Sequence, residues 1–208
     1  MFYLASTRFI NSTYIENITY REQSNEFAIY GTLIKIQYKY TIGSTMFVIE
    51  MNNETNTIEG IGLITNKVMY DKHYPIYKND DYNRYVYKGD YWISCENIRR
   101  FDPTIIEICD LILFKGKSHL KRQTGITVLT EKLFSNWPLY KLNVLKNSIK
   151  TLFISTFRKL SVQLIDNADK EDECVDKKEE KEDEEKEDKE KEDDKKEDEE
   201  KEDKLTNI

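Results

Sequence analysis

One segment of this chain, residues 169–204, is too highly charged to take part in a folded core. Of its 36 positions, 34 are Asp, Glu or Lys, and only Cys174 and Val175 interrupt the run. A segment with almost no apolar side chains cannot offset the conformational entropy that is lost on ordering. We therefore expect this segment to be disordered, and any fold must be built from the residues before it.

The charge of the chain is divided unevenly between this tail and the rest. The tail has 23 acidic residues and 11 lysines, a net charge of −12, whereas residues 1–168 carry +5, so that the whole chain has −7. A positively charged body attracts polyanions, and an acidic tail competes with them for the same surface. The division favours a nucleic-acid-binding body whose tail moderates binding.

Residues 1–168 have the length and apolar content of a single globular domain. We predict a β-rich domain over 1–138 and an amphipathic helix over 139–166 that packs on it. The disordered tail then occupies 167–208.

Nothing in the chain indicates export. Three widely spaced cysteines argue against a disulfide framework, and the first residues lack the basic lead and apolar core of a secretory signal. No apolar run approaches the roughly 18 residues of a membrane span. We expect an intracellular protein that is not secreted and has no transmembrane segment.

Alternating apolar and polar residues predict strands in the first half of the chain. Residues 34–41 alternate strictly, which is typical of a half-buried strand. Residues 46–51 and 57–65 then form a predicted hairpin around an Asn-rich loop. Gly60 and Gly62 share one face of the second strand, where glycine indicates a bend or the close approach of another group.

The middle of the chain predicts further short elements. Residues 82–87 and 91–94 are expected as strands on either side of a turn at 88–90, and a short helix from Pro103 is expected to pass into a strand at Leu111. The predicted fold class is α+β: a small, mostly antiparallel β-barrel with a C-terminal amphipathic helix and a disordered charged tail.

The C-terminal helix has two interpretations. Apolar residues recur at steps of three and four from Leu142 to Leu164, without an internal Gly or Pro. Such a stripe either packs on the barrel or docks on a partner protein. The second possibility defines an alternative function, a structural or interaction protein that uses the helix at 139–165.

A basic cluster late in the domain is the first candidate binding site. Its cations and histidine can present donors to phosphate oxygens, with Arg84 as a further contact; its members are Lys115, Lys117, His119, Lys121 and Arg122. The cluster lacks the glycine spacing of a P-loop, so nucleotide hydrolysis receives no support.

An aromatic cluster is the second candidate site. Bases taken out of a helix are held by aromatic stacking and by hydrogen bonds from amides. Tyr82, Asn83 and Trp92 supply both kinds of group within eleven positions of one another. We predict that these three residues line a pocket for a base or another ligand.

Metal-dependent chemistry has little basis in the residue spacing. The histidines and cysteines show no zinc-ligand spacing, and no cofactor is expected. Glu50 and Glu59 face each other across the predicted hairpin and could bind Mg²⁺, which defines a third hypothesis, a metal-dependent nuclease. The leading expectation remains a protein without enzymatic activity.

Three blocks of sequence, 47–66, 82–89 and 114–126, resemble a family of short uncharacterised proteins from nucleocytoplasmic large DNA viruses, the giant viruses. The resemblance covers about residues 27–136. The alternation of strands, the Gly-Ile-Gly strand and the late basic loop also resemble the PUA-like superfamily, which includes the EVE, ASCH and YTH barrels.

These resemblances imply a nucleic-acid-binding module of a large DNA virus that binds RNA or DNA, with a modified base as one ligand. They imply a location in the host cytoplasm or virus factory, with packaging in the virion as a further expectation. Under the alternative, the protein is a structural component of the virion or factory.

Overall fold

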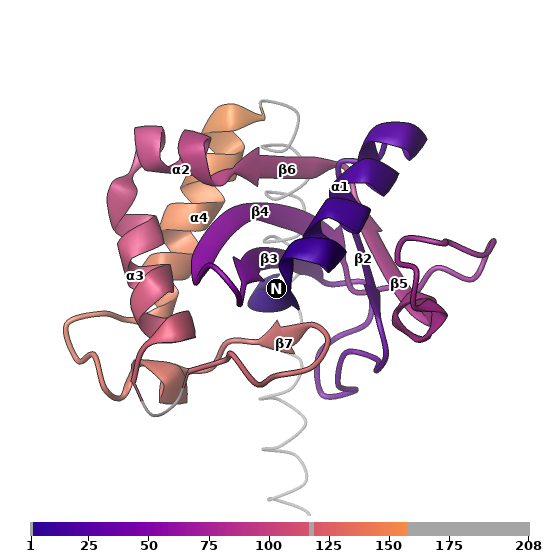
Figure 1. Ribbon diagram of the computed structural model, residues 1–208. Helices are drawn as coiled ribbons and strands as arrows, with labels where there is room; N and C mark the ends of the chain where they lie inside the picture. Colours follow the sequence, from indigo (N-terminus) through magenta and orange to yellow (C-terminus); the bar gives the residue numbers. More distant parts are fainter. Residues whose placement is uncertain (1, 117–118, 158–208) are drawn as a thin grey trace, which may run out of the picture. The chain divides into compact units, whose positions relative to one another are not determined.

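The computed structural model describes residues 2–116 and 119–157 (Figure 1). These residues belong to one compact unit, Met1–Leu160. The predicted tail at 167–208 lies outside the described residues, so its disorder stays a prediction.

Within the described residues the chain alternates short strands and helices. The strands are β1 (Phe2–Phe9), β2 (Ala28–Thr32), β3 (Thr45–Asn52), β4 (Thr57–Thr65), β5 (Tyr85–Gly89), β6 (Tyr91–Ser94) and β7 (Thr127–Val128). The α-helices are α1 (Asn11–Ser24), α2 (Cys95–Phe101), α3 (Pro103–Phe114) and α4 (Leu142–Thr156), and the 3₁₀ turns are η1 (Asp80–Asn83) and η2 (Glu131–Phe134).

The strands form two sheets, and the fold class is α+β. A five-stranded sheet has the order β6-β4-β3-β1-β7, and β2 pairs with β5 in a second, two-stranded sheet. Strands β1 and β3 are parallel, whereas the other pairs are antiparallel. The expectation of a mostly antiparallel arrangement is therefore confirmed.

The expected closed barrel is not formed by the described residues. Closure requires each strand to continue the hydrogen-bonded ladder of its neighbours. Here β5 and β6 follow one another in sequence but do not pair: β5 binds β2, while β6 binds β4. The ladder is thereby split into two sheets, which pack against each other instead of closing.

The hairpin at β3 and β4 confirms its prediction closely. The strands meet through the Asn-rich loop, in which Asn56 has a φ of 57°, the left-handed conformation that Asn tolerates. The register shifts between Glu50 and Met51, so that Glu50 pairs with Gly60 and Met51 with Ile58. This leaves Glu59 as the extra residue of a β-bulge.

The predicted strand at 34–41 was wrong, because this segment is a loop. Its backbone is bound by side chains instead of a neighbouring strand: the Ile36 amide donates to the Tyr87 hydroxyl at 3.0 Å, and the Asn66 amide donates to the carbonyls of Tyr40 and Thr41. Tyr38 is 85% exposed. Apolar and polar residues alternate here as they do in a strand, but no strand of the described residues pairs with this segment.

Helix α3 begins as predicted but extends further. Pro103 is its first residue, and the Asp102 carboxylate accepts from the Thr104 amide at 2.9 Å as a cap. The predicted strand at Leu111 was wrong, because the helix continues to Phe114. The buried side chains recur with helical spacing along one face: Ile105, Ile106, Cys109, Ile112 and Leu113.

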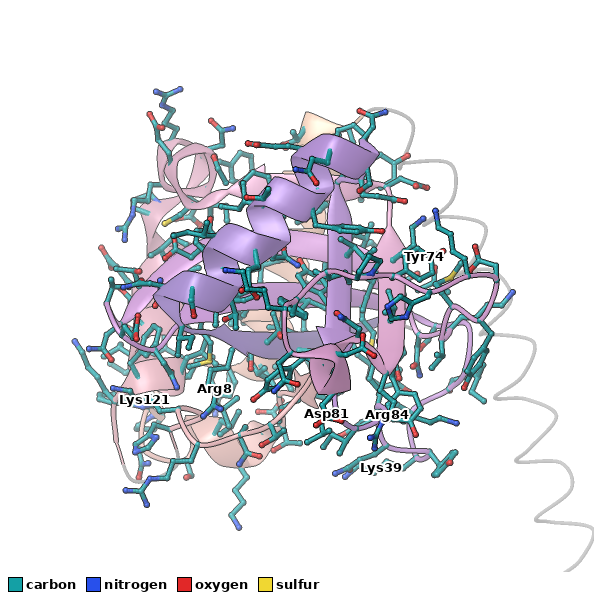
Figure 2. All side chains as sticks on the ribbon, turned by 45° about the vertical axis from the view of Figure 1, so that its right-hand side comes forward. Arg8, Lys39, Tyr74, Asp81, Arg84 and Lys121 are labelled. Carbon is teal, nitrogen blue, oxygen red and sulfur yellow. The ribbon has the colours of Figure 1, made fainter. Side chains whose placement is uncertain are left out.

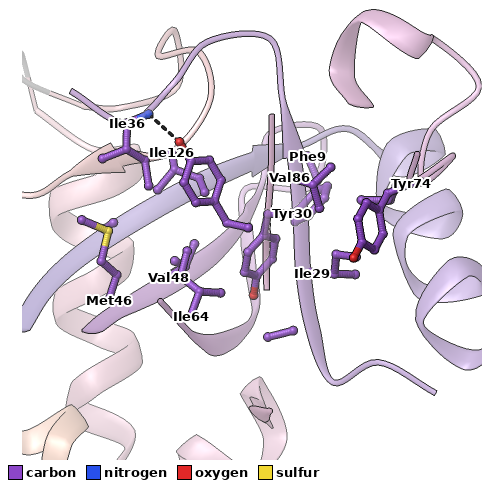
Figure 3. Close-up of a cluster of buried hydrophobic side chains, with 14 of the residues drawn as sticks. Phe9, Ile29, Tyr30, Ile36, Met46, Val48, Ile64, Tyr74, Val86 and Ile126 are labelled. Atoms are coloured by element: carbon purple, nitrogen blue, oxygen red, sulfur yellow. Dashed lines mark hydrogen bonds between the residues drawn. The ribbon is translucent and has the colours of Figure 1, made fainter. Parts of the chain in front are cut away.

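The five-stranded sheet is covered on both faces. Figure 1 shows α2, α3 and α4 on one side, and α1 with β2 and β5 on the other. On the helical side, the rings of Phe47 and Phe153 meet at 4.9 Å. On the opposite side, Tyr30 and Tyr87 pack with Val48 and Met46 in a buried cluster (Figure 3).

Helix α4 uses its apolar stripe inside the domain. Leu145, Ile149, Leu152 and Phe153 are each at most 1% exposed. The side chains that the alternative function would offer to a partner protein are therefore already covered. Residues of the predicted helix beyond 157 lie outside the described part of the chain. None of the helices in that part has the length and hydropathy needed to cross a bilayer.

Replacing Phe153 with alanine should therefore damage folding rather than an interaction with a partner. We expect Phe153→Ala to lower the free energy of unfolding by about 3–5 kcal/mol, because it leaves a cavity against Phe47. Urea denaturation followed by circular dichroism measures this change. The matched control is Val144→Ala on the exposed side of α4, expected within about 0.5 kcal/mol of the wild type. Equal stability of the two variants would contradict the packing described above.

Candidate functional site

A cavity of about 160 Å³ lies where β1 ends and α1 begins. It is smaller than the roughly 300–1,000 Å³ that a drug-sized ligand needs, and its size suits one small ring or a few waters. Its walls come from β1, α1, β2, the η1 region and the loop before β7: Thr7, Arg8, Phe9, Ile10, Thr13, Gly31, Thr32, Leu33, Tyr77, Tyr82, Thr124 and Gly125.

The local sequence explains why strand and helix meet here. A single residue, Ile10, separates β1 from α1, and the Thr13 hydroxyl accepts from the Ile10 amide at 3.0 Å while donating to its carbonyl. This tight junction directs the first turn of α1 toward the cavity. The N-terminal amides of a helix and its dipole favour negative charge. The Asn11 amide already donates to the Glu54 carboxylate at 2.8 Å.

Two tyrosine rings form one wall of the cavity. Tyr77 and Tyr82 meet edge to face, with ring centroids 6.2 Å apart and an interplanar angle of 77°. Gly31 allows this approach, because a Cβ at that position would collide with the Tyr82 carbonyl and lie 3.0 Å from the Tyr77 ring. Tyr77 is buried, whereas Tyr82 keeps 39% of its surface exposed. Tyr82 can therefore contact a ligand in the cavity.

Thr7 brings an unpaired polar group into the cavity. The residue is only 7% exposed, and its hydroxyl forms no hydrogen bond within residues 2–116 and 119–157. The hydroxyls of Thr13 and Thr32 also line the cavity, but both are bound to nearby backbone groups. Because Thr7 lines the cavity and its hydroxyl is unpaired, the hydroxyl is available as a donor or acceptor for a ligand.

Among the residues that line the cavity, Arg8 supplies the cationic side chain. Arg8 donates from Nη1 to the Lys121 carbonyl at 2.9 Å, which leaves its other N–H groups available. The same carbonyl accepts from the Asn53 side chain at 2.6 Å, and the Lys121 ammonium binds Asn56. Figure 2 shows Arg8 and Lys121 at the same edge of the molecule. These bonds hold the predicted basic loop against the end of β1.

A buried polar network lies beneath the cavity. Glu50 is fully buried, and its Oε1 accepts from Arg21 at 3.0 Å and from the Tyr30 hydroxyl at 2.7 Å. Its Oε2 has no hydrogen-bond partner among the described residues. Glu50 is also the strand partner of Thr7 in the β1–β3 pair. The network therefore adjoins the floor of the cavity.

Asn17 joins this network to the tyrosine wall. Its side-chain amide donates to the Ile29 carbonyl at 2.8 Å and to the Tyr77 hydroxyl at 3.2 Å. Burial, followed by the charge of Glu50, raises the pKa of Tyr30 well above its ordinary value, and burial likewise raises the pKa of Tyr77. Both phenols thus stay protonated over the physiological range.

The structure separates Trp92 from Tyr82, although the sequence suggested a common pocket. Trp92 lies in β6, three strand positions from β1, or about 14 Å at the usual strand spacing. Its ring is covered by the Arg21 guanidinium at 4.5 Å, and its Nε1 is buried. Gly60 accommodates the ring, since a Cβ there would lie 2.7 Å from it. The close approach of the Trp92 ring thus explains why β4 has glycine at position 60.

Asn83 and Arg84 line a different, more open cavity of about 370 Å³. The Asn83 side chain accepts from the amides of Ile76 and Tyr77 and donates to the Tyr77 carbonyl, so it shapes the loop before η1. Arg84 is paired with Asp81 at 3.1 Å. Of the three residues predicted for a base pocket, Tyr82 alone lines the 160 Å³ cavity.

The predicted basic cluster is brought only partly to the cavity. Lys121 is bound beside Arg8, and Arg122 follows it as an exposed residue. Lys115 is exposed at the end of α3, and His119 is half-buried, with a buried Nδ1 that has no partner among the described residues. Lys117 lies outside the described residues, so its role stays a prediction.

The two glutamates of the nuclease hypothesis have protein partners. Glu50 is held by Arg21 and Tyr30, and Glu59 accepts from Asn52 and from Thr57, each at 3.1 Å. Across the described part of the chain, no group of three or more His, Cys, Asp or Glu side chains gathers in a way that could hold a metal ion.

Sequence reasoning missed Thr7, Arg8 and Thr13, which belong to elements that it had not assigned. A signal was present: an apolar run at residues 2–5 precedes Asn11, Ser12 and Thr13, residue types that favour helix N-termini. That pattern indicates a strand followed by a helix.

The chain matches no protein-family model, no curated protein and no solved structure.

The buried ion pair gives a test of the site's framework. We expect Arg21→Met to lower the free energy of unfolding by about 3–5 kcal/mol, because Glu50 would keep a buried charge without its partner. The double variant Arg21→Met with Glu50→Gln should lose less than the sum of the single changes. Denaturation in urea measures all three.

The matched control is Arg100→Met, which removes an exposed pair with Glu96 and should change stability by no more than about 0.5 kcal/mol. Strict additivity of the Arg21 and Glu50 changes would mean that the pair does not hold α1 on the sheet.

Proposed function

We propose that this chain is a non-enzymatic nucleic-acid-binding module that takes one unpaired base into the 160 Å³ cavity. The observation that carries the proposal is the cavity itself, whose walls include a partly exposed tyrosine ring, an unpaired threonine hydroxyl and an arginine. Base recognition outside a helix needs this combination of stacking, hydrogen bonding and positive charge. The proposal keeps the function class of the PUA-like resemblance without its closed barrel.

The base would contact Tyr82 and Thr7. The Tyr82 ring offers an exposed aromatic surface at the wall, and the hydroxyl of Thr7 can donate or accept at the floor. A threonine hydroxyl alone does not select one base, so the identity of the base, including a modification, is set by the fit of the cavity.

The phosphates would lie at the mouth of the cavity. Arg8 retains free N–H groups there, and Lys121 and Arg122 follow on the loop that it binds. The N-terminus of α1 adds a favourable dipole, while Glu54 opposes it with negative charge. The acidic residues of 169–204 would compete with phosphates for these cations and so limit non-specific binding.

Substitutions at the cavity should separate the ionic contact with phosphates from the hydrogen bond to the base. Arg8→Met should weaken binding to labelled single-stranded DNA and RNA and reduce the salt slope by about one. Thr7→Val should weaken binding about fivefold with an unchanged slope, because it removes a hydrogen bond but no charge. Fluorescence anisotropy at several salt concentrations measures both effects.

The control for these variants is Arg100→Met, which removes an exposed cation from α2 and should leave the affinity unchanged. The proposal fails if the protein without residues 169–208 binds no oligonucleotide at about 50 mM salt, where electrostatic binding is strong.

Removing the tail should strengthen binding. A chain that ends at residue 168 is expected to bind single-stranded oligonucleotides severalfold more tightly than the full chain at low salt, with the difference shrinking as salt screens the charges. The control is a chain that ends at Lys204, which loses four uncharged residues and keeps every acid. Equal affinity of the two truncated chains would show that the tail does not compete.

A further inference from the structure

An exposed aromatic surface lies beside the loop at 33–44, and it combines Tyr38 of that loop with rings from two other segments. Tyr38 is 85% exposed and Tyr70 is 72% exposed, which is unusual for large rings on a folded domain. Lys35 lies over two rings, 5.9 Å from the Tyr70 centroid and 5.2 Å from that of Tyr85. Together with Lys39 they form what is here termed the aromatic–lysine patch: Lys35, Tyr38, Lys39, Tyr70 and Tyr85.

The patch is electrostatically positive along its loop. No acidic residue occurs between Glu26 and Glu50, so the loop at 33–44 carries Lys35 and Lys39 without a compensating carboxylate. Lys39 lies 5.1 Å from the Tyr40 ring and stands at the outer margin of this part of the molecule in Figure 2. Cations are thus interleaved with aromatic faces.

The loop that carries Lys35, Tyr38 and Lys39 is held in place before any ligand binds. Ile36 is buried in the core, and its amide donates to the Tyr87 hydroxyl, the hydrogen bond drawn in Figure 3. Asn66 fixes the far end of the loop, since its side chain donates to two loop carbonyls and its backbone bonds with Gly43 and Ser44. A fixed loop loses little entropy on binding.

The patch and the cavity share a strand pair. Thr32, which lines the cavity, is the β2 partner of Tyr85 in β5. Lys35 follows Thr32 by three residues, a distance of at most about 11 Å along the chain. In addition, Ile34 packs against Gly125, another cavity residue. A ligand that leaves the cavity mouth can therefore reach the patch directly.

We propose that the aromatic–lysine patch is a stacking platform for the nucleotides next to the base in the cavity, so that the ligand is a single strand several nucleotides long. This inference rests on the proposed function, and it specifies the class of ligand as single-stranded nucleic acid. Rings with exposed faces stack bases of any sequence, and the interleaved lysines meet the phosphates between them. Paired bases in a duplex have no free faces to offer, so a duplex is disfavoured.

The experiment compares the full chain with a variant that carries Tyr38→Ala and Tyr70→Ala. The probes are fluorescein-labelled twelve-nucleotide poly-T DNA and poly-U RNA, a labelled trinucleotide, and a duplex of the same length, at about 50 mM salt. We expect the variant to bind the twelve-nucleotide strands at least about fivefold more weakly, since each stacked ring supports a base. Binding of the trinucleotide should change little.

Two controls isolate stacking from folding. Tyr38→Phe with Tyr70→Phe keeps the rings and should bind the twelve-nucleotide strands more tightly than the alanine variant. Phe27→Ala removes an exposed ring at the opposite end of β2, about 16 Å from Thr32, and should bind like the wild type. Circular dichroism checks that each variant folds.

Several results would overturn the platform while leaving the cavity proposal intact. Unchanged affinity of the alanine variant for the long strands, together with weaker binding by Arg8→Met, would show that the patch does not contact nucleic acid. Equal losses for duplex and single strand would exclude stacking. Phosphatidylserine–phosphatidylcholine vesicles serve as a further probe. If the alanine variant binds these vesicles more weakly but binds every oligonucleotide like the wild type, the patch is a membrane-binding surface. If the wild type and the chain without residues 169–208 bind none of the oligonucleotides, the proposed function itself fails.

Discussion

The arrangement of the domain depends on one buried contact, the ion pair between Arg21 of α1 and Glu50 of β3. Burying two charges is costly, and the cost is recovered only when their geometry is good and further hydrogen bonds are made. Tyr30 and Trp92 complete this environment from β2 and β6. The pair therefore draws α1 and β2 onto the same face of the sheet. Together with the hydrogen bond from Asn17 to the Ile29 carbonyl, it fixes α1 and β2, which supply walls of the 160 Å³ cavity.

This constraint also explains the glycines of β4. Close packing of Tyr30 and Trp92 over the sheet leaves no space for side chains, and a Cβ at Gly62 would collide with the Tyr30 hydroxyl. The side chains around the buried ion pair thus require glycine at positions 60 and 62 of β4. The same face of the sheet holds the ion pair in its interior and presents Thr7 at its margin, where the cavity begins.

The candidate site and the aromatic–lysine patch lie at one end of the β2–β5 sheet. The cavity is small and the patch is exposed, and the pair of Thr32 and Tyr85 lies at their common boundary. A ligand with one ring in the cavity and others on the patch would use both.

Sequence reasoning succeeded where a signal was local. The hairpin of β3 and β4, the start of α3 at Pro103 and the amphipathic character of α4 are each encoded by residues within a few positions of one another. It failed at residues 34–41, because alternation resembles a strand whether or not a partner edge is free. It also placed Tyr82 and Trp92 in one pocket, although Tyr82 lies in the turn η1 and Trp92 in strand β6.

The sequence by itself determined that a mildly basic, tyrosine-rich body precedes a strongly acidic segment, and that lysines are interleaved with aromatic residues. Only the tertiary structure decided which of those rings are exposed and which cations lie beside a cavity. The reason is physical: composition and periodicity depend on neighbours along the chain, whereas exposure depends on strand pairing between residues far apart in sequence. Arg8 and Lys121, separated by 113 positions, meet for that reason.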